Sequence, residues 1–248
     1  MRTHSVVKQN KGFGFILLAL SCLLLLSVVL RVSLYRFEYD PKYYATDFGR
    51  WNYFSYFTVQ SNLLIAVYAG LAGLSLLGLQ RFRFVLKPQV GLLMTTYILI
   101  TGAVYCSGFP LGMTPPLTWD TPYHCMLSSI QILHHMISPL VIFCFWLSQG
   151  DSPLLSKRAL FAVGIYPFVY SLISIARGAF CTPTFYTYPF YNPRFAASLV
   201  PTDPPLSDAM GYLLMIPMMV VGIGLFILVA CILRLIHNKQ HHRNDPEE

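Results

Sequence analysis

Long apolar stretches separated by short polar segments dominate the pattern along the chain. A helix that crosses a membrane needs about 20 mostly apolar residues, and six stretches reach that length. They cover residues 13–35, 52–79, 88–109, 124–147, 158–180 and 208–235. The pattern therefore predicts an all-α fold: a polytopic membrane helical bundle with about six transmembrane helices, forming a single integral membrane domain over residues 1–248.

The composition supports a lipid environment and argues against nucleic acid as a partner. Of the 248 residues, 55% are hydrophobic and 11% are charged, whereas a soluble domain carries about 25% charged residues. The net charge of +7 does not form a basic stripe on an amphipathic element. It is spread over short connecting segments, as expected of a membrane protein and not of a nucleic-acid-binding one.

The first apolar stretch also resembles a secretory signal peptide, because it follows basic residues. It is longer than the apolar part of a signal peptide. Arg31, Tyr35 and Arg36 follow its core in place of a small-residue cleavage site. These features favour a retained membrane helix.

The positions of the lysines and arginines predict the orientation. They concentrate in the N-terminal tail, the segments after the second and fourth stretches, and the C-terminal tail: Arg2, Lys8, Lys11, Arg81, Arg83, Lys87, Lys157, Arg158, Arg234, Lys239 and Arg243. The alternate connections hold only Arg36, Lys42, Arg50 and Arg194. Because positive residues accumulate on the cytoplasmic side, both termini are predicted to be cytoplasmic.

The six cysteines do not suggest a disulfide framework. Three lie within apolar stretches, where buried free thiols are expected: Cys22, Cys144 and Cys231. The other three lie near helix ends on one side of the membrane, where one disulfide among them is left open: Cys106, Cys125 and Cys181.

Polar residues gather in the second stretch. Thr58, Ser61 and Asn62 have the spacing of one helix face. Such residues often form hydrogen bonds between membrane helices, at about 0.6 kcal/mol each. Structural contact between helices is therefore one interpretation, and substrate binding or catalysis is the other.

Adjacent histidines, His134 and His135, lie in the middle of the fourth stretch. Neighbouring helical residues point about 100° apart, so the two rings line a polar cavity or find separate partners. Pro139 is expected to free a backbone carbonyl near His135 and to kink the helix. His124 lies too far towards the membrane surface to complete a ligand set with the pair, so no metal site is expected.

Arg177 lies near the outer end of the fifth stretch. Its long side chain could extend to the membrane surface. The alternative is that its guanidinium binds an anionic headgroup or a carboxylate from the outer leaflet.

Three sequence motifs occur together. These are residues 54–62 (FSYFTVQSN), residues 133–135 (LHH) followed by Pro139, and residues 177–178 (RG) followed by 188–190 (YPF) and 192–193 (NP). In this order they resemble the androgen-induced protein family of six-span membrane proteins, most closely its bacterial branch. The resemblance extends over nearly all six spans.

The resemblance implies an intramembrane threonine hydrolase of fatty acid esters of hydroxy fatty acids, without a cofactor. Thr58 would be the nucleophile and His134 or His135 the base. Membrane lipids and a lipid ester would be the partners, in a bacterial inner membrane. A histidine can accept the proton of a threonine hydroxyl.

Weaker substrate-binding candidates are Ser61, Asn62 and Arg177, of which Ser61 or Asn62 could donate to an oxyanion. The alternative function is a non-catalytic lipid-binding or transport protein whose polar residues line a cavity. The oligomeric state is left open.

Overall fold

The computed structural model describes residues 10–34, 49–110, 114, 116–149, 154–181 and 185–244. Within these residues all regular secondary structure is helical, and six helices are long and apolar enough to cross a membrane. They are α1 (Lys11–Ser33), α3 (Phe57–Leu76), α4 (Pro88–Gly108), the continuous run of α5 (Pro122–Ile132), η4 (Leu133–Ile137) and α6 (Ser138–Leu147), α7 (Arg158–Phe180) and α9 (Asp208–Asn244). The predicted six-helix membrane bundle is confirmed.

Four short helical elements connect these spans. They are η2 (Gly49–Ser55), η3 (Gln80–Leu86), η5 (Pro189–Tyr191) and α8 (Pro193–Ser198). Residues 52–55, predicted as the beginning of the second span, belong to the 3₁₀ helix η2, so α3 begins only at Phe57. Thr58 is consequently the second residue of its helix, whereas it is the seventh residue of the predicted stretch 52–79.

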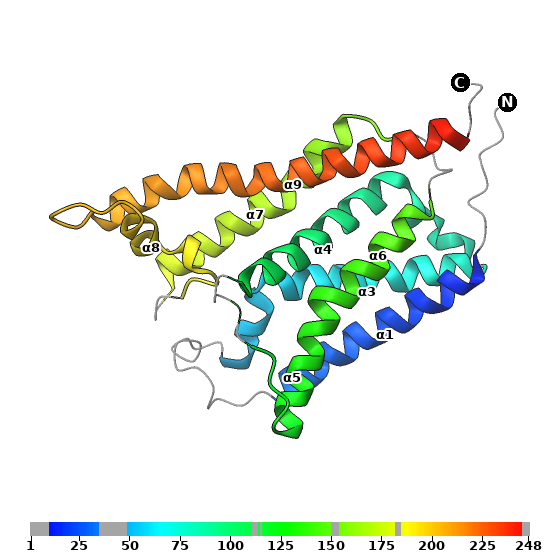
Figure 1. Ribbon diagram of the computed structural model, residues 1–248, viewed down its shortest axis with the longest axis horizontal. Coiled ribbons are helices and arrows are strands. Elements are labelled where there is room, and N and C mark those ends of the chain that lie inside the picture. Colours follow the sequence, from blue (N-terminus) through cyan, green and yellow to red (C-terminus); the bar gives the residue numbers. More distant parts are fainter. Residues whose placement is uncertain are drawn as a thin grey trace.

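The helices alternate in direction (Figure 1). The Lys11 end of α1, the segment η3 and the Asn244 end of α9 lie at the same end of the bundle. We call this the inner end, and the opposite end, which holds η2, η5 and α8, the outer end. Arg81, Arg83 and Arg158 lie at the inner end, in agreement with the charge asymmetry that places both termini on one side of the membrane.

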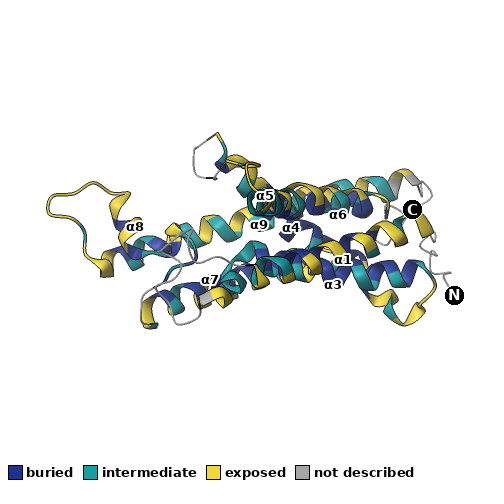
Figure 2. Ribbon diagram, turned by 90° about the horizontal axis from the view of Figure 1, so that it is seen from below, coloured by how far each residue is buried: buried dark blue, intermediate teal, exposed yellow. Residues whose placement is uncertain are grey.

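Burial follows the faces between helices, and many apolar side chains point outward, as expected of a bundle surrounded by lipid (Figure 2). Helices α1 and α3 pack closely against each other. A Cβ atom added to Gly73 would lie 2.8 Å from the backbone oxygen of Gly14. Glycines at both positions therefore let the two backbones approach each other closely. Leu17, Leu24 and Ile65 fill the same interface without exposure.

An aromatic cluster anchors the first turn of α3. The Phe57 ring lies 5.2–6.5 Å from the rings of Tyr97, Tyr166, Tyr170 and Phe226. These rings come from α4, α7 and α9. Aromatic pairs at such distances contribute about 0.5–1.5 kcal/mol beyond their buried area, so the position of the neighbouring Thr58 is set by four helices.

All six cysteines are free thiols. The disulfide left open among Cys106, Cys125 and Cys181 is not formed in the structure. The chain is therefore held together by packing and hydrogen bonds.

Candidate active site

The fourth span changes its helical register at the histidine pair. Residues Leu133–Ile137 form a single turn of π-helix, in which the Ser138 N–H donates to the Leu133 carbonyl five residues earlier. In the same pattern, residue 139 would donate to the His134 carbonyl five residues earlier, but Pro139 has no N–H. The freed carbonyl is therefore that of His134, one position earlier than the sequence suggested for an ordinary α-helix. Single π turns often mark functional sites.

Asn62 supplies the missing partner. Its Nδ2 donates to the His134 backbone oxygen at 3.2 Å and to the Thr58 backbone oxygen at 2.9 Å. The amide thus joins the first turn of α3 to the π turn at the middle of the fourth span. Its Oδ1 is buried and has no hydrogen-bond partner among the described residues. Thr58, Asn62 and His134 therefore belong to one polar network.

Ser27 of α1 holds the His134 ring. Its Oγ lies 2.7 Å from His134 Nε2 and donates to the Leu24 carbonyl at 2.7 Å. Since a serine hydroxyl has one proton, its oxygen accepts from the His134 Nε2–H. The Nδ1 atom of His134 then carries the ring's lone pair. His134 is 2% exposed and lies about 18 Å along the helix from Pro122.

His135 faces a different helix. Its Nδ1 donates to the Thr101 carbonyl at 3.3 Å, and its ring stacks on Tyr105 at 3.7 Å between centroids. Thr101 and Tyr105 both belong to α4. A Cβ atom on Gly102 would lie 2.7 Å from the His135 carbonyl, so α4 passes close to this turn. Of the two alternatives that the sequence left open, this arrangement corresponds to separate partners for the two rings.

Ser61 serves the contact between α3 and α4. Its Oγ lies 2.9 Å from Thr101 Oγ1 and 3.0 Å from the Thr58 carbonyl. Thr101 in turn donates to the Tyr97 carbonyl at 2.9 Å. Every one of these hydrogen bonds is internal, so Ser61 acts here as the interhelical contact that the sequence offered as one of its two interpretations.

Thr58 lies half-buried at the outer end of the network, where the Tyr188 hydroxyl approaches it. Burial raises the pKa of Tyr188, and hydrogen bonds with the Thr58 side chain and with the N–H groups of Thr58 and Phe57 oppose that rise. The first N–H groups of a helix have no partner within the helix. The Tyr188 hydroxyl is therefore a neighbour of these N–H groups and of the Thr58 side chain.

Arg177 holds η2 against α7. Its guanidinium donates to Ser55 Oγ and Asn52 Oδ1, and lies 4.8 Å from the centre of the Phe185 ring. The Tyr170 hydroxyl also donates to the Ser55 carbonyl, at 2.7 Å. Arg177 thus fixes the segment that leads into Thr58. The structure connects it to the site through η2 and not through the histidines.

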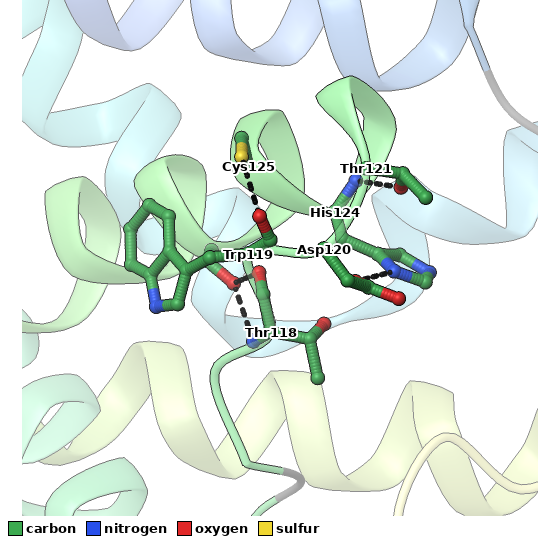
Figure 3. A network of polar contacts seen from close by, with 7 residues as sticks. Thr118, Trp119, Asp120, Thr121, His124 and Cys125 are labelled. Carbon is green, nitrogen blue, oxygen red and sulfur yellow. Dashed lines mark hydrogen bonds and ion pairs between the residues drawn. The ribbon is translucent and has the colours of Figure 1, made fainter.

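His124 lies in the first turn of α5, apart from the histidine pair, and Figure 3 shows its contacts with Asp120 and Thr121. Its Nδ1 is 2.5 Å from Asp120 Oδ1, and its backbone N–H donates to the Thr121 hydroxyl at 3.1 Å. The hydrogen bond from His124 lowers the pKa of Asp120. Within the described residues no group of three His, Cys, Asp or Glu side chains is placed to hold a metal ion.

The structure thus brings Thr58, Ser61, Asn62 and His134 into one network, turns His135 towards α4 and places Arg177 behind η2. Sequence reasoning missed Ser27 and Tyr188 as members. Ser27 is one of two buried serines on the leucine-rich helix α1, the other being Ser21, and the sequence does not indicate which of them contacts a histidine. No family model matches the chain, and comparisons with curated proteins and with solved structures also give no match.

Proposed function

We propose that the protein is an intramembrane hydrolase of lipid esters, in which Thr58 is the nucleophile and His134 the general base. The observation that supports this most directly is the Asn62 side chain, which bonds to the backbones of both Thr58 and His134. The backbone positions that carry the Thr58 hydroxyl and the His134 imidazole, on separate helices, are thereby joined. The proposal places the protein in a bacterial inner membrane, with a lipid ester as substrate.

The start of α3 suits an acyl-transfer reaction. The N–H groups of Phe57 and Thr58 have no partner within their own helix, and they lie at its N-terminus, where the helix dipole favours negative charge. A substrate carbonyl that displaces the Tyr188 hydroxyl would direct its oxygen at these donors. Removal of one oxyanion donor from a known hydrolase costs about 2.7–4 kcal/mol of transition-state stabilisation.

The chemistry then proceeds in two steps. Thr58 Oγ1 attacks the ester carbonyl, its proton passes to the lone-pair nitrogen of His134, and the tetrahedral oxyanion is stabilised by the N–H donors. The carbon–oxygen bond to the alcohol breaks, and the alkoxide takes the proton from His134. His134 then takes a proton from water, which attacks the acyl-threonine. The bond between the acyl carbon and Thr58 Oγ1 breaks, and Thr58 takes the proton back from His134.

His134 is preferred to His135 as the base because of its neighbours. Asn62 ties His134 to the helix of Thr58, and Ser27 fixes the ring so that Nδ1 is the basic atom. The His135 ring is committed to Thr101 and Tyr105 on α4. Ser61 and Asn62 are proposed to position this network, and Arg177 to position the entry to α3.

The test is covalent labelling in detergent micelles with a lipophilic fluorophosphonate, followed by mass spectrometry of the adduct. Wild type is compared with Thr58→Ala, His134→Ala and His135→Ala. Thr96→Ala is the control, because Thr96 is a buried threonine that donates to its own helix at Leu92. We expect the label on Thr58, lost in Thr58→Ala and His134→Ala and retained in His135→Ala and Thr96→Ala.

Several outcomes would contradict the proposal. A label on Ser27 would transfer the nucleophile to the serine that already touches His134. Labelling of Thr58 that is lost in His135→Ala and retained in His134→Ala would show that His135, and not His134, is the general base. A folded wild-type protein that takes no label and cleaves no lipid ester would exclude the hydrolase, and solute flux in liposomes would then test the transport alternative.

A further inference from the structure

A second polar group lies at the inner end of the bundle, outside the histidine network. It is centred on Gly91, near the beginning of α4. A Cβ atom at Gly91 would lie 3.6 Å from both the Tyr68 hydroxyl and the Gln149 Oε1, and 3.1 Å from Trp146 Cδ1. Because Gly91 has no side chain, the space beside its Cα atom is lined by Tyr68 of α3 and by Trp146 and Gln149 at the end of the fourth span.

The polar atoms around this space have no hydrogen-bond partner among the described residues. They are the Tyr68 hydroxyl and both the Nε2 and the Oε1 of Gln149. Tyr68 is 4% exposed and Gln149 5% exposed. An unpaired buried polar atom costs free energy, and three such atoms around one glycine indicate that the group has a partner of its own.

The chemistry of these atoms restricts that partner. Gln149 offers two N–H donors and a carbonyl acceptor, and the Tyr68 hydroxyl both donates and accepts. Neither side chain carries a charge, so a buried ion would find no counter-charge on them. A small neutral molecule that donates and accepts at once fits best, and the smallest of these is water, which commonly makes about three hydrogen bonds when buried.

Similar unpaired atoms continue from this group towards the histidines. The Thr95 hydroxyl lies one turn further along α4 on the face of Gly91, and the Ser138 hydroxyl lies one turn after His134. The Oδ1 atom of Asn62 ends the series beside the His134 carbonyl. Thr95 and Ser138 are fully buried, as is Asn62. The series lies on α3, α4 and α6, the helices that enclose the histidine layer.

We infer that this seam, consisting of Gln149, Tyr68, Thr95, Ser138 and Asn62, binds a row of ordered water molecules that extends from the inner end of the bundle to the His134 layer. The inference concerns binding and stands without the hydrolase. Its role as the supply of hydrolytic water rests on the proposed function, because an ester cleaved within lipid needs water that the lipid does not provide.

Radiolytic hydroxyl-radical footprinting of the full-length protein in lipid nanodiscs tests the seam directly, since radicals formed from bound water oxidise the side chains that touch it. Tyr68 is compared with Tyr97, which is 3% exposed but donates its hydroxyl to the Val163 carbonyl at 3.2 Å. We expect Tyr68 to be oxidised several-fold faster than Tyr97, with ¹⁸O incorporated from labelled water. Equal rates would overturn the inference.

A glycine substitution gives a second readout. Gly91→Ala places a methyl group in the space between Tyr68 and Gln149, and should reduce the oxidation of Tyr68 towards the Tyr97 level. Gly164→Ala is the matched control, because its nearest contact is an ordinary 3.4 Å from Ile223. Unchanged oxidation of Tyr68 in a folded Gly91→Ala protein would contradict the site.

The two experiments test the water seam and the hydrolase independently, so that either proposal can be excluded while the other is retained. Rapid oxidation of Tyr68 without fluorophosphonate labelling of Thr58 would retain the water seam and exclude the hydrolase. Labelling of Thr58 with equal oxidation of Tyr68 and Tyr97 would retain the hydrolase and exclude the seam. Both measurements use the same wild-type protein.

Discussion

The side-chain amide of Asn62 donates, at 3.2 Å, to the backbone carbonyl of His134, which Pro139 leaves without a backbone partner. Three residues from two helices thus explain one another. Pro139 lacks the N–H that would donate to a backbone carbonyl. The π turn makes this the carbonyl of His134, and the Asn62 amide donates to it instead. The relationship predicts that Asn62 and Pro139 are energetically coupled, although they lie far apart in the sequence.

Replacement of Asn62 by leucine should destabilise the protein by about 1–3 kcal/mol, since it leaves a buried carbonyl without a donor. Pro139→Ala supplies an N–H at position 139, so the same Asn62 substitution should cost less in that background. A double-mutant cycle on thermal stability in detergent measures the coupling, expected at about 0.5–3 kcal/mol. Asn62 paired with Thr96 is the control cycle, and equal coupling in both cycles would refute the explanation.

Ser27→Ala should reduce fluorophosphonate labelling of Thr58 because the His134 ring loses the partner that fixes its tautomer. Ser21→Ala is a close control. Ser21 lies on the same helix, is similarly buried and donates to the Ala66 carbonyl at 2.7 Å. Each substitution should lower stability by about 1 kcal/mol.

Only the Ser27 substitution should lower the labelling rate, and Ser27→Thr should restore part of it. If both serine variants label at the wild-type rate, Ser27 is a structural contact alone. Measurement of the rate against pH separates the cases further, since loss of tautomer control changes the apparent pKa of the base, whereas loss of packing does not.

The number and order of the spans were predictable because hydrophobic length is a local property of the sequence. The face shared by Thr58, Ser61 and Asn62 was predictable from helical periodicity. The register change at His134 was not, because a π turn depends on how α4 and α6 pack near Gly102. Partners from distant helices, such as Ser27 for His134, also required the three-dimensional structure.

Arg177→Ala should loosen η2, because Ser55 and Asn52 lose the guanidinium that holds them. Hydrogen–deuterium exchange should quicken in residues 49–58 and the labelling rate of Thr58 should fall. Arg194→Ala is the control, since its 3.4 Å contact with Asp208 is largely exposed, and exposed ion pairs contribute little. If exchange in η2 is unchanged, Arg177 does not position the helix start.

Buried tyrosines at the outer end predict a loss of stability in alkali. Burial raises the pKa of Tyr53 and of Tyr191 to about 12, and raises that of Tyr188 as well. Above pH 10 the unfolded chain loses protons that the folded chain retains, so the unfolded state binds fewer protons and stability falls as the pH rises. Below pH 10 this contribution is fully present.

The test is thermal unfolding between pH 8 and about pH 12, the range set by the ordinary and raised tyrosine pKa values. The thermal unfolding midpoint of the wild type should stay constant up to about pH 10 and fall progressively above it. The midpoint of Tyr191→Phe should be lower than that of the wild type at pH 8, because the variant loses the 2.9 Å contact with Ser171. Above pH 10 its midpoint should fall less steeply. Tyr123→Phe is the control, since it also removes a tyrosine hydroxyl and one hydrogen bond, the 3.2 Å bond from the Arg31 guanidinium, away from Tyr191. If both variants decline as steeply as the wild type, Tyr191 does not contribute to the alkaline transition.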